Sequence, residues 1–301
     1  MANEKAMVVK DNLLIEASYR LELSEQRLIL MAIVKARATK PITSDTVLEV
    51  TAKDYSEICD MDIRNAYRRM KEAAETLFER KVRLRSTHER TGKNAITTTR
   101  WVSSCTYVEQ AGIVELQLAP KIIPYITDLE SKFTSYQLKN VAQMTSTYAI
   151  RLYELLAQYK TIGARYLQIQ QLKEFLGADE KSYERLDNFK RIVLKVAVEQ
   201  INTLTDLDVS FIDKKSGRSV VGFEFIIQQK RVEKTIDVAD KKQKEPQSAS
   251  TTKVAIGLSL SEKSMLRDLA AKTGRSEPEV LAEAQKQGGD LFVELDKMLK
   301  A

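Results

Sequence analysis

The stretch YERLDNFKRIVLKVAVEQIN, residues 183–202, has two chemically different faces when it is read at helical spacing. One face is an apolar stripe that we expect to pack on a core, formed by Leu186, Phe189, Val193, Val196 and Ile201. The opposite face is basic and polar, with candidate base-reading side chains in its first turns at Arg185, Asn188, Lys190 and Arg191. Such side chains can form paired hydrogen bonds with guanine and adenine edges in the major groove. The stretch therefore predicts a helix that reads DNA bases.

A β-hairpin is predicted directly after this helix, in DLDVSFIDKKSGRSVVGFEFIIQQK, residues 206–230. Apolar residues alternate with polar ones on both sides of the turn, at Val209, Phe211, Val221, Phe223 and Phe225. The turn, KKSGR at residues 214–218, is basic, and the candidate phosphate contacts are Lys195 on the helix together with Lys214, Lys215 and Arg218. A charged stripe alone is equally typical of a solvated helix surface, but the basic hairpin tip favours nucleic acid. A basic helix followed by such a hairpin is the plan of a winged-helix DNA-binding domain.

Composition and charge set broad limits on the protein. Its 301 residues are enough for two domains, and a hydrophobic content of 43% with 30% charged residues is typical of a globular protein. The net charge of +6 makes a polyanion such as nucleic acid a plausible partner. Cys59 and Cys105 form no metal-binding or redox motif and are predicted to be reduced thiols. Because no apolar run is long enough to span a bilayer, we expect a cytoplasmic protein with no membrane partner.

The order of predicted elements occurs twice along the chain. In the first half, a strand (VLEVTA, residues 47–52) precedes a short helix (53–60), a long helix (DIRNAYRRMKEAAETLFER, 62–80) and strands at 81–91, 93–110 and 113–120. The long helix should bury the side chains of Tyr67, Met70, Ala74, Leu77 and Phe78. The second half repeats strand (166–170), short helix (171–179), long helix and hairpin. This repeat predicts an α+β fold with two tandem winged-helix domains and a small helical C-terminal extension.

Domain boundaries follow from helix caps and composition. An N-terminal winged-helix domain is predicted at residues 1–143 and a C-terminal one at 144–232, with Ser146 or Thr147 capping the first helix of the second domain. Residues 233–256 are polar and rich in Lys, Gln and Ser, which predicts a flexible linker. Residues 257–301 are predicted to form a small helical module.

The motifs of common DNA enzymes are absent from the sequence. Gly92-Lys93 lacks the upstream glycine of a phosphate-binding loop and is followed by Asn94 instead of Ser or Thr. His88 is the only histidine, too few for the metal site of a nickase. Asp60 and Asp62 precede a helix and are interpreted as cap and first-turn charges. We therefore expect no catalytic residue, no metal, no cofactor and no enzyme activity.

Two segments of the chain carry a family resemblance: VKDNLLIEASYRLELSEQRLILMAIVKAR at residues 9–37 and FTSYQLKNVAQMTSTYAIRLYELLAQYK at residues 133–160. They resemble the Rep_3 superfamily of iteron-binding plasmid replication initiators, and the similarity covers roughly residues 8–230. The resemblance implies double-stranded origin DNA as partner, with monomers that bind direct repeats, the iterons. It also implies dimers that bind an inverted-repeat operator, repress the initiator gene and form through the first domain. The host replicative helicase and chromosomal initiator are further implied partners.

The same resemblance assigns roles to particular side chains. The family pattern Arg-x-x-Asp-Phe-Arg-Arg lies on Arg185, Asn188, Phe189, Lys190 and Arg191, so Asn and Lys replace Asp and Arg at two of its positions. This departure implies a different base preference. The corresponding helix of the first domain would lie along a neighbouring groove and contact DNA through Arg64, Arg68 and Arg69. A winged-helix transcriptional repressor without initiation activity is the alternative function.

Overall fold

The computed structural model describes residues 6–39, 41–88, 90–127, 129, 132–178, 183–230 and 280. The chain divides into two compact units, Met1–Glu233 and Lys234–Ala301, and the elements named below belong to the first unit. The predicted linker at residues 233–256 and the predicted helical module at 257–301 lie outside the described residues, apart from Val280. Among the described residues, no helix has the length and hydrophobicity that a membrane span requires.

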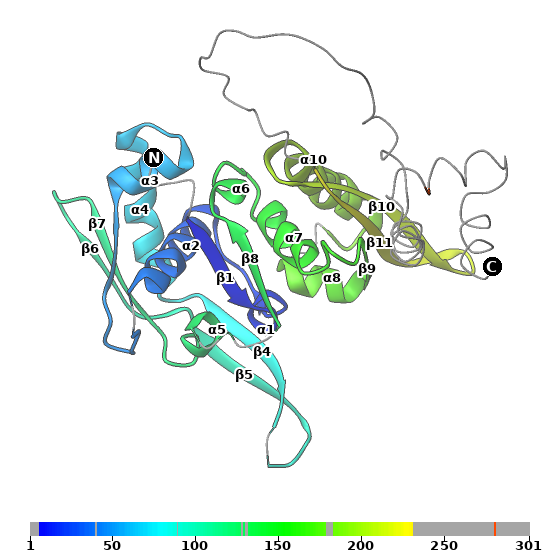
Figure 1. The fold of residues 1–301 in the computed structure, drawn as a ribbon, viewed down its shortest axis with the longest axis horizontal. Helices are drawn as coiled ribbons and strands as arrows, with labels where there is room; N and C mark the ends of the chain where they lie inside the picture. The colour runs from blue at the N-terminus through cyan, green and yellow to red at the C-terminus, as the bar shows by residue number, and fades with distance from the viewer. Residues whose placement is uncertain are drawn as a thin grey trace, which may run out of the picture. The chain divides into compact units, whose positions relative to one another are not determined.

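The second half of the first unit forms a winged helix (Figure 1). Its elements in chain order are α7 (Thr147–Ala157), β9 (Ala164–Gln168), α8 (Ile169–Leu176), a long helix, β10 (Leu207–Ser216) and β11 (Ser219–Gln229). The three strands form an antiparallel sheet in the order β10-β11-β9. The Phe211 ring lies 5.6 Å from the Phe223 ring and 5.9 Å from the Phe225 ring, and these aromatic contacts hold the two strands of the hairpin together. The Ser146 hydroxyl accepts a hydrogen bond from the Ala149 amide, so the predicted cap of α7 is confirmed.

The long helix of this domain consists of three contiguous segments. They are α9 (Leu186–Asn188), the π-helical segment η3 (Phe189–Leu194) and α10 (Lys195–Leu204), so the helix begins three residues later than predicted. Buried residues recur along it at every fourth position, at Phe189, Val193, Ala197 and Ile201. A π turn holds more residues than an α turn, and the buried line therefore follows a spacing of four. Val196, predicted to be buried, is 37% exposed for this reason.

The first half of the unit repeats the same topology. Its elements are α2 (Leu23–Ala38), β3 (Leu48–Thr51), α3 (Ala52–Cys59), α4 (Ile63–Leu77) and a hairpin of β6 (Val102–Val108) and β7 (Ile113–Leu118). The sheet order β3-β7-β6 corresponds to β9-β11-β10, because in both domains the strand after the first helix pairs with the second strand of the hairpin. The predicted α+β fold with two tandem winged-helix domains is confirmed.

An additional hairpin is inserted into the first domain between α4 and β6. It consists of β4 (Lys81–Thr87) and β5 (Asn94–Arg100) and forms a separate sheet with β2 (Ser18–Tyr19). The single strand predicted at residues 93–110 is wrong, because the chain leaves one sheet and enters another at Trp101. Trp101 is fully buried and its ring lies 4.8 Å from the ring of Tyr19, which makes this change of sheet part of the core.

Helix α4 packs on the core through small as well as large residues. Met70, Ala74 and Leu77 are buried as predicted, but Tyr67 and Phe78 are each 37% exposed. The buried line runs through Ala66 and Ala73 instead, and the two aromatic residues lie at its edges. Phe78 is covered by Arg100, whose guanidinium carbon lies 4.2 Å from the ring centre.

A two-stranded sheet and three short helices complete the first domain. Strand β1 (Met7–Asp11) pairs antiparallel with β8 (Phe133–Gln137), and the short helices α1 (Asn12–Ile15), α5 (Pro124–Thr127) and α6 (Lys139–Ala142) lie in the connections. The boundary predicted at residues 143 and 144 falls between α6 and α7 and stays a prediction.

We use the name junction network for Lys10, Tyr19, Tyr136, Arg151 and Glu154, all of which are buried. The Glu154 carboxylate lies 2.6 Å from the Lys10 ammonium and 3.2 Å from the Arg151 guanidinium, and it accepts a hydrogen bond from Tyr136 at 2.5 Å. Arg151 also donates to the backbone carbonyls of Ile15 and Ala17 in the first domain. Buried charges are tolerated when they are paired in this way.

Candidate nucleic-acid interface

The long helix of the second domain is held firmly on its own domain. Phe189 is buried against Phe223 of the hairpin, with ring centres 6.4 Å apart. The Asn202 side chain exchanges two hydrogen bonds with the backbone of Val209, at 2.9 and 2.7 Å. Lys230 donates to the carbonyl oxygens of Asn202 and Thr205 at the end of α10. These contacts fix the angle between helix and hairpin, so both can meet one DNA surface as a unit.

The predicted base-reading residues lie at the start of this helix. Arg185 occupies the N-cap position of α9 and is exposed, Asn188 is half-buried, and Arg191 is exposed one turn later. Lys195, a predicted phosphate contact, is exposed on the next turn. Arg185, Arg191 and Lys195 have no ion pair with another described residue. Their charges are therefore available to a polyanion.

Lys190 differs from its neighbours. Its ammonium lies 2.9 and 2.8 Å from the two carboxylate oxygens of Asp213 on β10, and each of the two side chains is 26% exposed. This pair links the predicted base-reading helix to the hairpin. To contact a base, the Lys190 side chain would have to exchange Asp213 for the DNA, so the ion pair competes with its predicted role.

The tip of the β10–β11 hairpin is basic. Ser216 pairs with Ser219, which leaves Gly217 and Arg218 as a two-residue turn, and Gly217 has a φ of 59° that favours glycine. Lys215 and Arg218 are exposed, whereas Lys214 lies 2.5 Å from Glu224 on the opposite strand. The strand register shifts between Lys214 and Lys215, and Val221 on the opposite strand is 40% exposed, although it alternates in the sequence with the buried Phe223 and Phe225.

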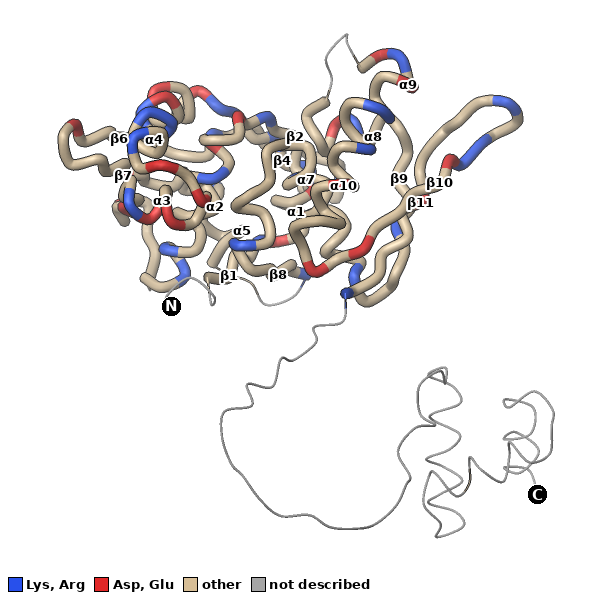
Figure 2. The backbone as a smooth tube through the Cα atoms, turned by 90° about the horizontal axis from the view of Figure 1, so that it is seen from above, with Lys and Arg blue, Asp and Glu red and all other residues tan. Residues whose placement is uncertain are grey.

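The corresponding helix of the first domain, α4, also presents arginines to solvent. Asp62 caps the helix by accepting a hydrogen bond from the Arg64 amide, and the Arg64 side chain is exposed. Arg68 and Arg69 both lie near Glu72, at 3.6 and 3.5 Å. Exposed ion pairs of this kind contribute about 0–1 kcal/mol and exchange readily for phosphate. Figure 2 shows Lys and Arg on α4, on α8 and at the β10–β11 tip.

Two apolar residues on the same face were not recognised in the sequence as candidates. Ile192 is 40% exposed and Val196 is 37% exposed, and they alternate along the helix with Arg191 and Lys195. Apolar side chains in the major groove can contact the methyl group of thymine. Apolar residues of a helix are normally predicted to face the core, and the sequence contains no pattern from which we predicted the π-helical segment that turns these two outward.

No group of three or more His, Cys, Asp or Glu residues in the described part of the chain is placed to hold a metal ion. Burial raises the pKa of the Cys59 thiol to about 11, and burial likewise raises the pKa of Cys105 to about 11. Both cysteines are unpaired, as expected for reduced thiols. Asp60 has a left-handed backbone conformation at the end of α3, and Asp62 caps α4.

Comparison with known proteins gives matches over most of the described chain. The family description "Initiator Replication protein, WH1" matches residues 7–157, and "Initiator Rep protein, WH2" matches residues 168–227. A crystal structure of the Pi initiator protein in complex with iteron DNA superimposes with a TM-score of 0.64. The two sequences are 25% identical, and the match covers 75% of this chain and 98% of that one.

Two curated proteins are also similar in sequence. An uncharacterized 27.6 kDa protein of Escherichia coli is 26% identical over 227 residues, which cover 72% of this chain and 94% of that protein. A probable replication protein of Bifidobacterium longum is 27% identical over 136 residues, which cover 45% of each protein.

Proposed function

The chain belongs to the Rep_3 family of initiator replication proteins, and from this premise we propose that it initiates plasmid replication by binding iteron DNA through both winged-helix domains. Membership in this family also confirms the expectation of a non-enzymatic DNA-binding protein. The observation that carries the proposal is the exposed basic face of the long helix beside a basic hairpin tip. The similarity to a protein crystallised with iteron DNA, over 98% of that protein's length, supports the choice of DNA.

In the proposed complex the helix of α9, η3 and α10 lies in the major groove. Arg185, Asn188 and Arg191 contact base edges, and Ile192 and Val196 contact thymine methyl groups. Lys190 remains a candidate base contact, provided that DNA displaces it from Asp213.

Phosphate contacts hold the protein in register on the duplex. In the second domain we assign them to Lys195, Lys215 and Arg218, and to Lys214 if it releases Glu224. In the first domain we assign DNA contacts on α4 to Arg64, Arg68 and Arg69. The loop that joins the strands of the β6–β7 hairpin carries Glu109, which lies 3.0 Å from Lys71, so in this domain the helix is the more favourable contact.

Autorepression and host contacts extend the proposal. Family membership supports a dimer, formed through the first domain, that binds an inverted-repeat operator and represses the initiator gene. It also supports contacts with the host replicative helicase and chromosomal initiator. The domain limits at residues 1–143 and 144–232 are part of the same proposal.

The test compares two variants in binding to a library of double-stranded sites based on the repeats that flank the gene. Arg191→Ala should lose about 1–3 kcal/mol of discrimination at one base pair, because a paired contact to a base edge is removed. Lys215→Ala should weaken all sites about equally and lower the slope of log K against log salt by about one. If Arg191→Ala leaves the ranking of sites unchanged, the helix does not read bases.

A replication assay separates initiation from repression alone. A plasmid whose only replication gene is this one, with its flanking repeats, is introduced into a host that lacks other initiators for it. Stable plasmid replication supports the initiator. Operator binding and repression without replication support the winged-helix repressor, which uses the same DNA-binding face.

A further inference from the structure

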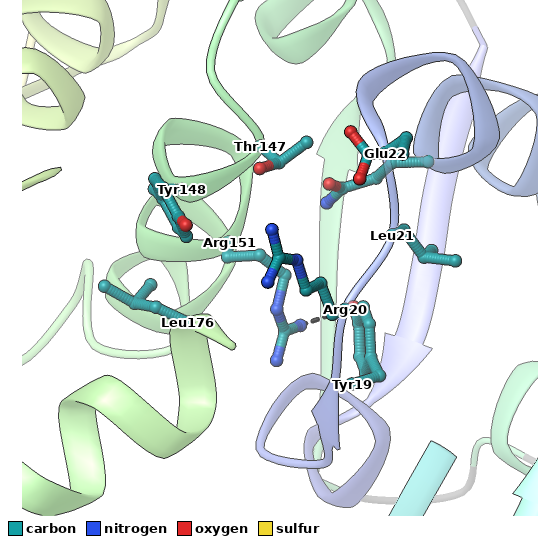
Figure 3. Close-up of a pocket in the computed structure, with 9 residues that line it drawn as sticks. Tyr19, Arg20, Leu21, Glu22, Thr147, Tyr148, Arg151 and Leu176 are labelled. Carbon is teal, nitrogen blue, oxygen red and sulfur yellow. Dashed lines mark hydrogen bonds between the residues drawn. The ribbon is translucent and has the colours of Figure 1, made fainter. Parts of the chain in front are cut away.

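A pocket lies where the two domains meet, apart from the proposed base-reading helix face. It has a volume of about 210 Å³. Its walls come from residues 19–22 before α2, from Gln26 on α2, from the start of α7 and from the end of α8 (Figure 3). Since a water molecule occupies about 30 Å³ in the liquid, the pocket has room for a small anion with some of its hydration shell.

Two arginines make the pocket electropositive. Figure 3 shows Arg20 reaching from the first domain across the pocket toward α7, with Arg151 next to it. Arg151 is buried, and its guanidinium donates to Tyr19 and to the backbone carbonyls of Ile15 and Phe175. Arg151 therefore contributes charge to the pocket wall, and Arg20 lines the pocket from the first domain.

Gln26 supplies a buried donor without an acceptor. Its side chain lines the pocket and is 2% exposed, and its Nε2 atom has no hydrogen-bond partner among the described residues. Leaving a buried amide unsatisfied costs about 1–3 kcal/mol, so such groups normally have a partner. A ligand with acceptor oxygens in the pocket would provide it.

The N-terminus of α7 adds further donors. This helix has eleven residues, and Thr147 in its first turn lines the pocket with its hydroxyl-bearing side chain. The first amides of a helix have no acceptor within the helix, and the helix dipole places partial positive charge at this end. Helix N-termini with these properties bind phosphate and similar anions.

One acidic residue also lines the pocket. The Glu22 side chain is 64% exposed, and its carboxylate lies 3.9 Å from Arg80. Exposure and the neighbouring guanidinium reduce its repulsion of an anion. The hydrogen-bond donors of the pocket and its two arginines outnumber this one carboxylate, which favours a ligand with several acceptor oxygens.

We propose that this pocket binds a phosphate group, held by Arg20, Gln26 and the start of α7. The phosphate could belong to the backbone of bound DNA or be free in solution. The Tyr148 hydroxyl in the pocket wall lies 3.4 Å from the Tyr183 hydroxyl, two residues before Arg185. This contact connects the pocket to the start of the proposed base-reading helix. The assignment of this phosphate to the DNA backbone rests on the proposed function, whereas binding of free phosphate does not.

The first experiment titrates inorganic phosphate into the full-length protein without DNA, by calorimetry at constant ionic strength. Arg20→Ala and Gln26→Leu should each weaken phosphate binding at least tenfold. Arg37→Ala, at the exposed opposite end of α2, is the matched control and should change binding less than twofold. Gln26→Leu should keep or raise the midpoint of denaturant unfolding without phosphate, because it removes an unsatisfied donor. Absence of phosphate binding by the wild type, or equal losses in the control and in the pocket variants, would overturn the proposal.

The second experiment identifies the source of the phosphate from the salt dependence of DNA binding. If DNA supplies it, Arg20→Ala should lower the slope of log K against log salt by about one, as for a lost phosphate contact. If the variant loses inorganic phosphate binding but keeps the wild-type slope, the pocket binds free phosphate. A wild type that binds phosphate but no DNA would refute the proposed function and leave the pocket assignment intact.

Discussion

Replacing Glu154 by Gln tests whether the junction network holds the two domains together. The Glu154 carboxylate is fully buried and lies between the Lys10 ammonium at 2.6 Å and the Arg151 guanidinium at 3.2 Å. Lys10 lies on β1 and Glu154 on α7, 144 residues apart in the sequence. The substitution removes the negative charge and changes the side-chain volume little.

The expected cost follows from what the substitution leaves behind. Lys10 and Arg151 are 1% and 2% exposed, so their charges cannot be solvated by water once the carboxylate is gone. Removing one partner of a buried ion pair costs about 3–5 kcal/mol. Tyr136 can still donate its hydrogen bond to the amide oxygen of Gln, which places the expected loss near 3 kcal/mol, a factor of roughly 10² in the folding equilibrium.

The assay is denaturant unfolding of the full-length protein at pH 7. Glu224→Gln is the matched control, because Glu224 is 32% exposed and pairs with Lys214, and it should cost less than about 1 kcal/mol. The double variant Lys10→Met/Glu154→Gln should recover part of the loss, since no buried ammonium remains. A loss below about 1 kcal/mol for Glu154→Gln, equal to that of the control, would refute the reasoning.

Three further predictions concern pH, thiol reactivity and a close backbone approach. Burial alone would raise the pKa of Glu154, but the charges of Lys10 and Arg151 outweigh it and hold this pKa below that of an exposed glutamate. The stability that this carboxylate contributes is therefore complete above about pH 4.3 and is lost as the pH falls through its lower pKa in the folded protein. In unfolding measured from pH 5 down to pH 2, the free energies of unfolding of the wild type and of Glu154→Gln should therefore converge. Burial raises the pKa of Cys59 and of Cys105 to about 11, so both thiols should react slowly with a disulfide reagent at pH 7 in the folded protein and rapidly after unfolding. Gly177→Ala should lower the unfolding midpoint more than Gly217→Ala: both glycines have positive φ, but a Cβ at Gly177 would lie 2.7 Å from the Tyr19 carbonyl oxygen, whereas one at Gly217 meets open space.

Features with a local cause could be predicted from the sequence. The alternation of Phe223 and Phe225 with polar residues is enough to predict a strand that is half-buried, and the repeated order of elements is enough to predict two domains of one type. The exposure of Arg185 and Arg191 also follows from helical spacing, because the apolar face of the same helix has to be buried. The predicted DNA-contacting roles of these residues stay predictions.

The points at which a regular local pattern changes are visible only in the folded chain. Val196 belongs to the apolar stripe at ideal helical spacing, but the π-helical segment moves it outward, and Trp101 lies in a continuous strand pattern but is the point where the chain changes sheet. No periodicity indicates that Lys190 pairs with Asp213.

The junction between the two domains depends on contacts that no local sequence pattern predicts. Lys10 and Glu154, and likewise the pocket residues Arg20, Gln26 and Thr147, lie far apart in the sequence and meet only when the two domains pack. Spacing along the chain is enough to predict most of the helices and strands and most of the residues that they bury, because each of these features has a local cause. The pairing of buried charges and the shape of the pocket depend on contacts between distant segments, so they follow from the packing of the folded chain and not from local spacing.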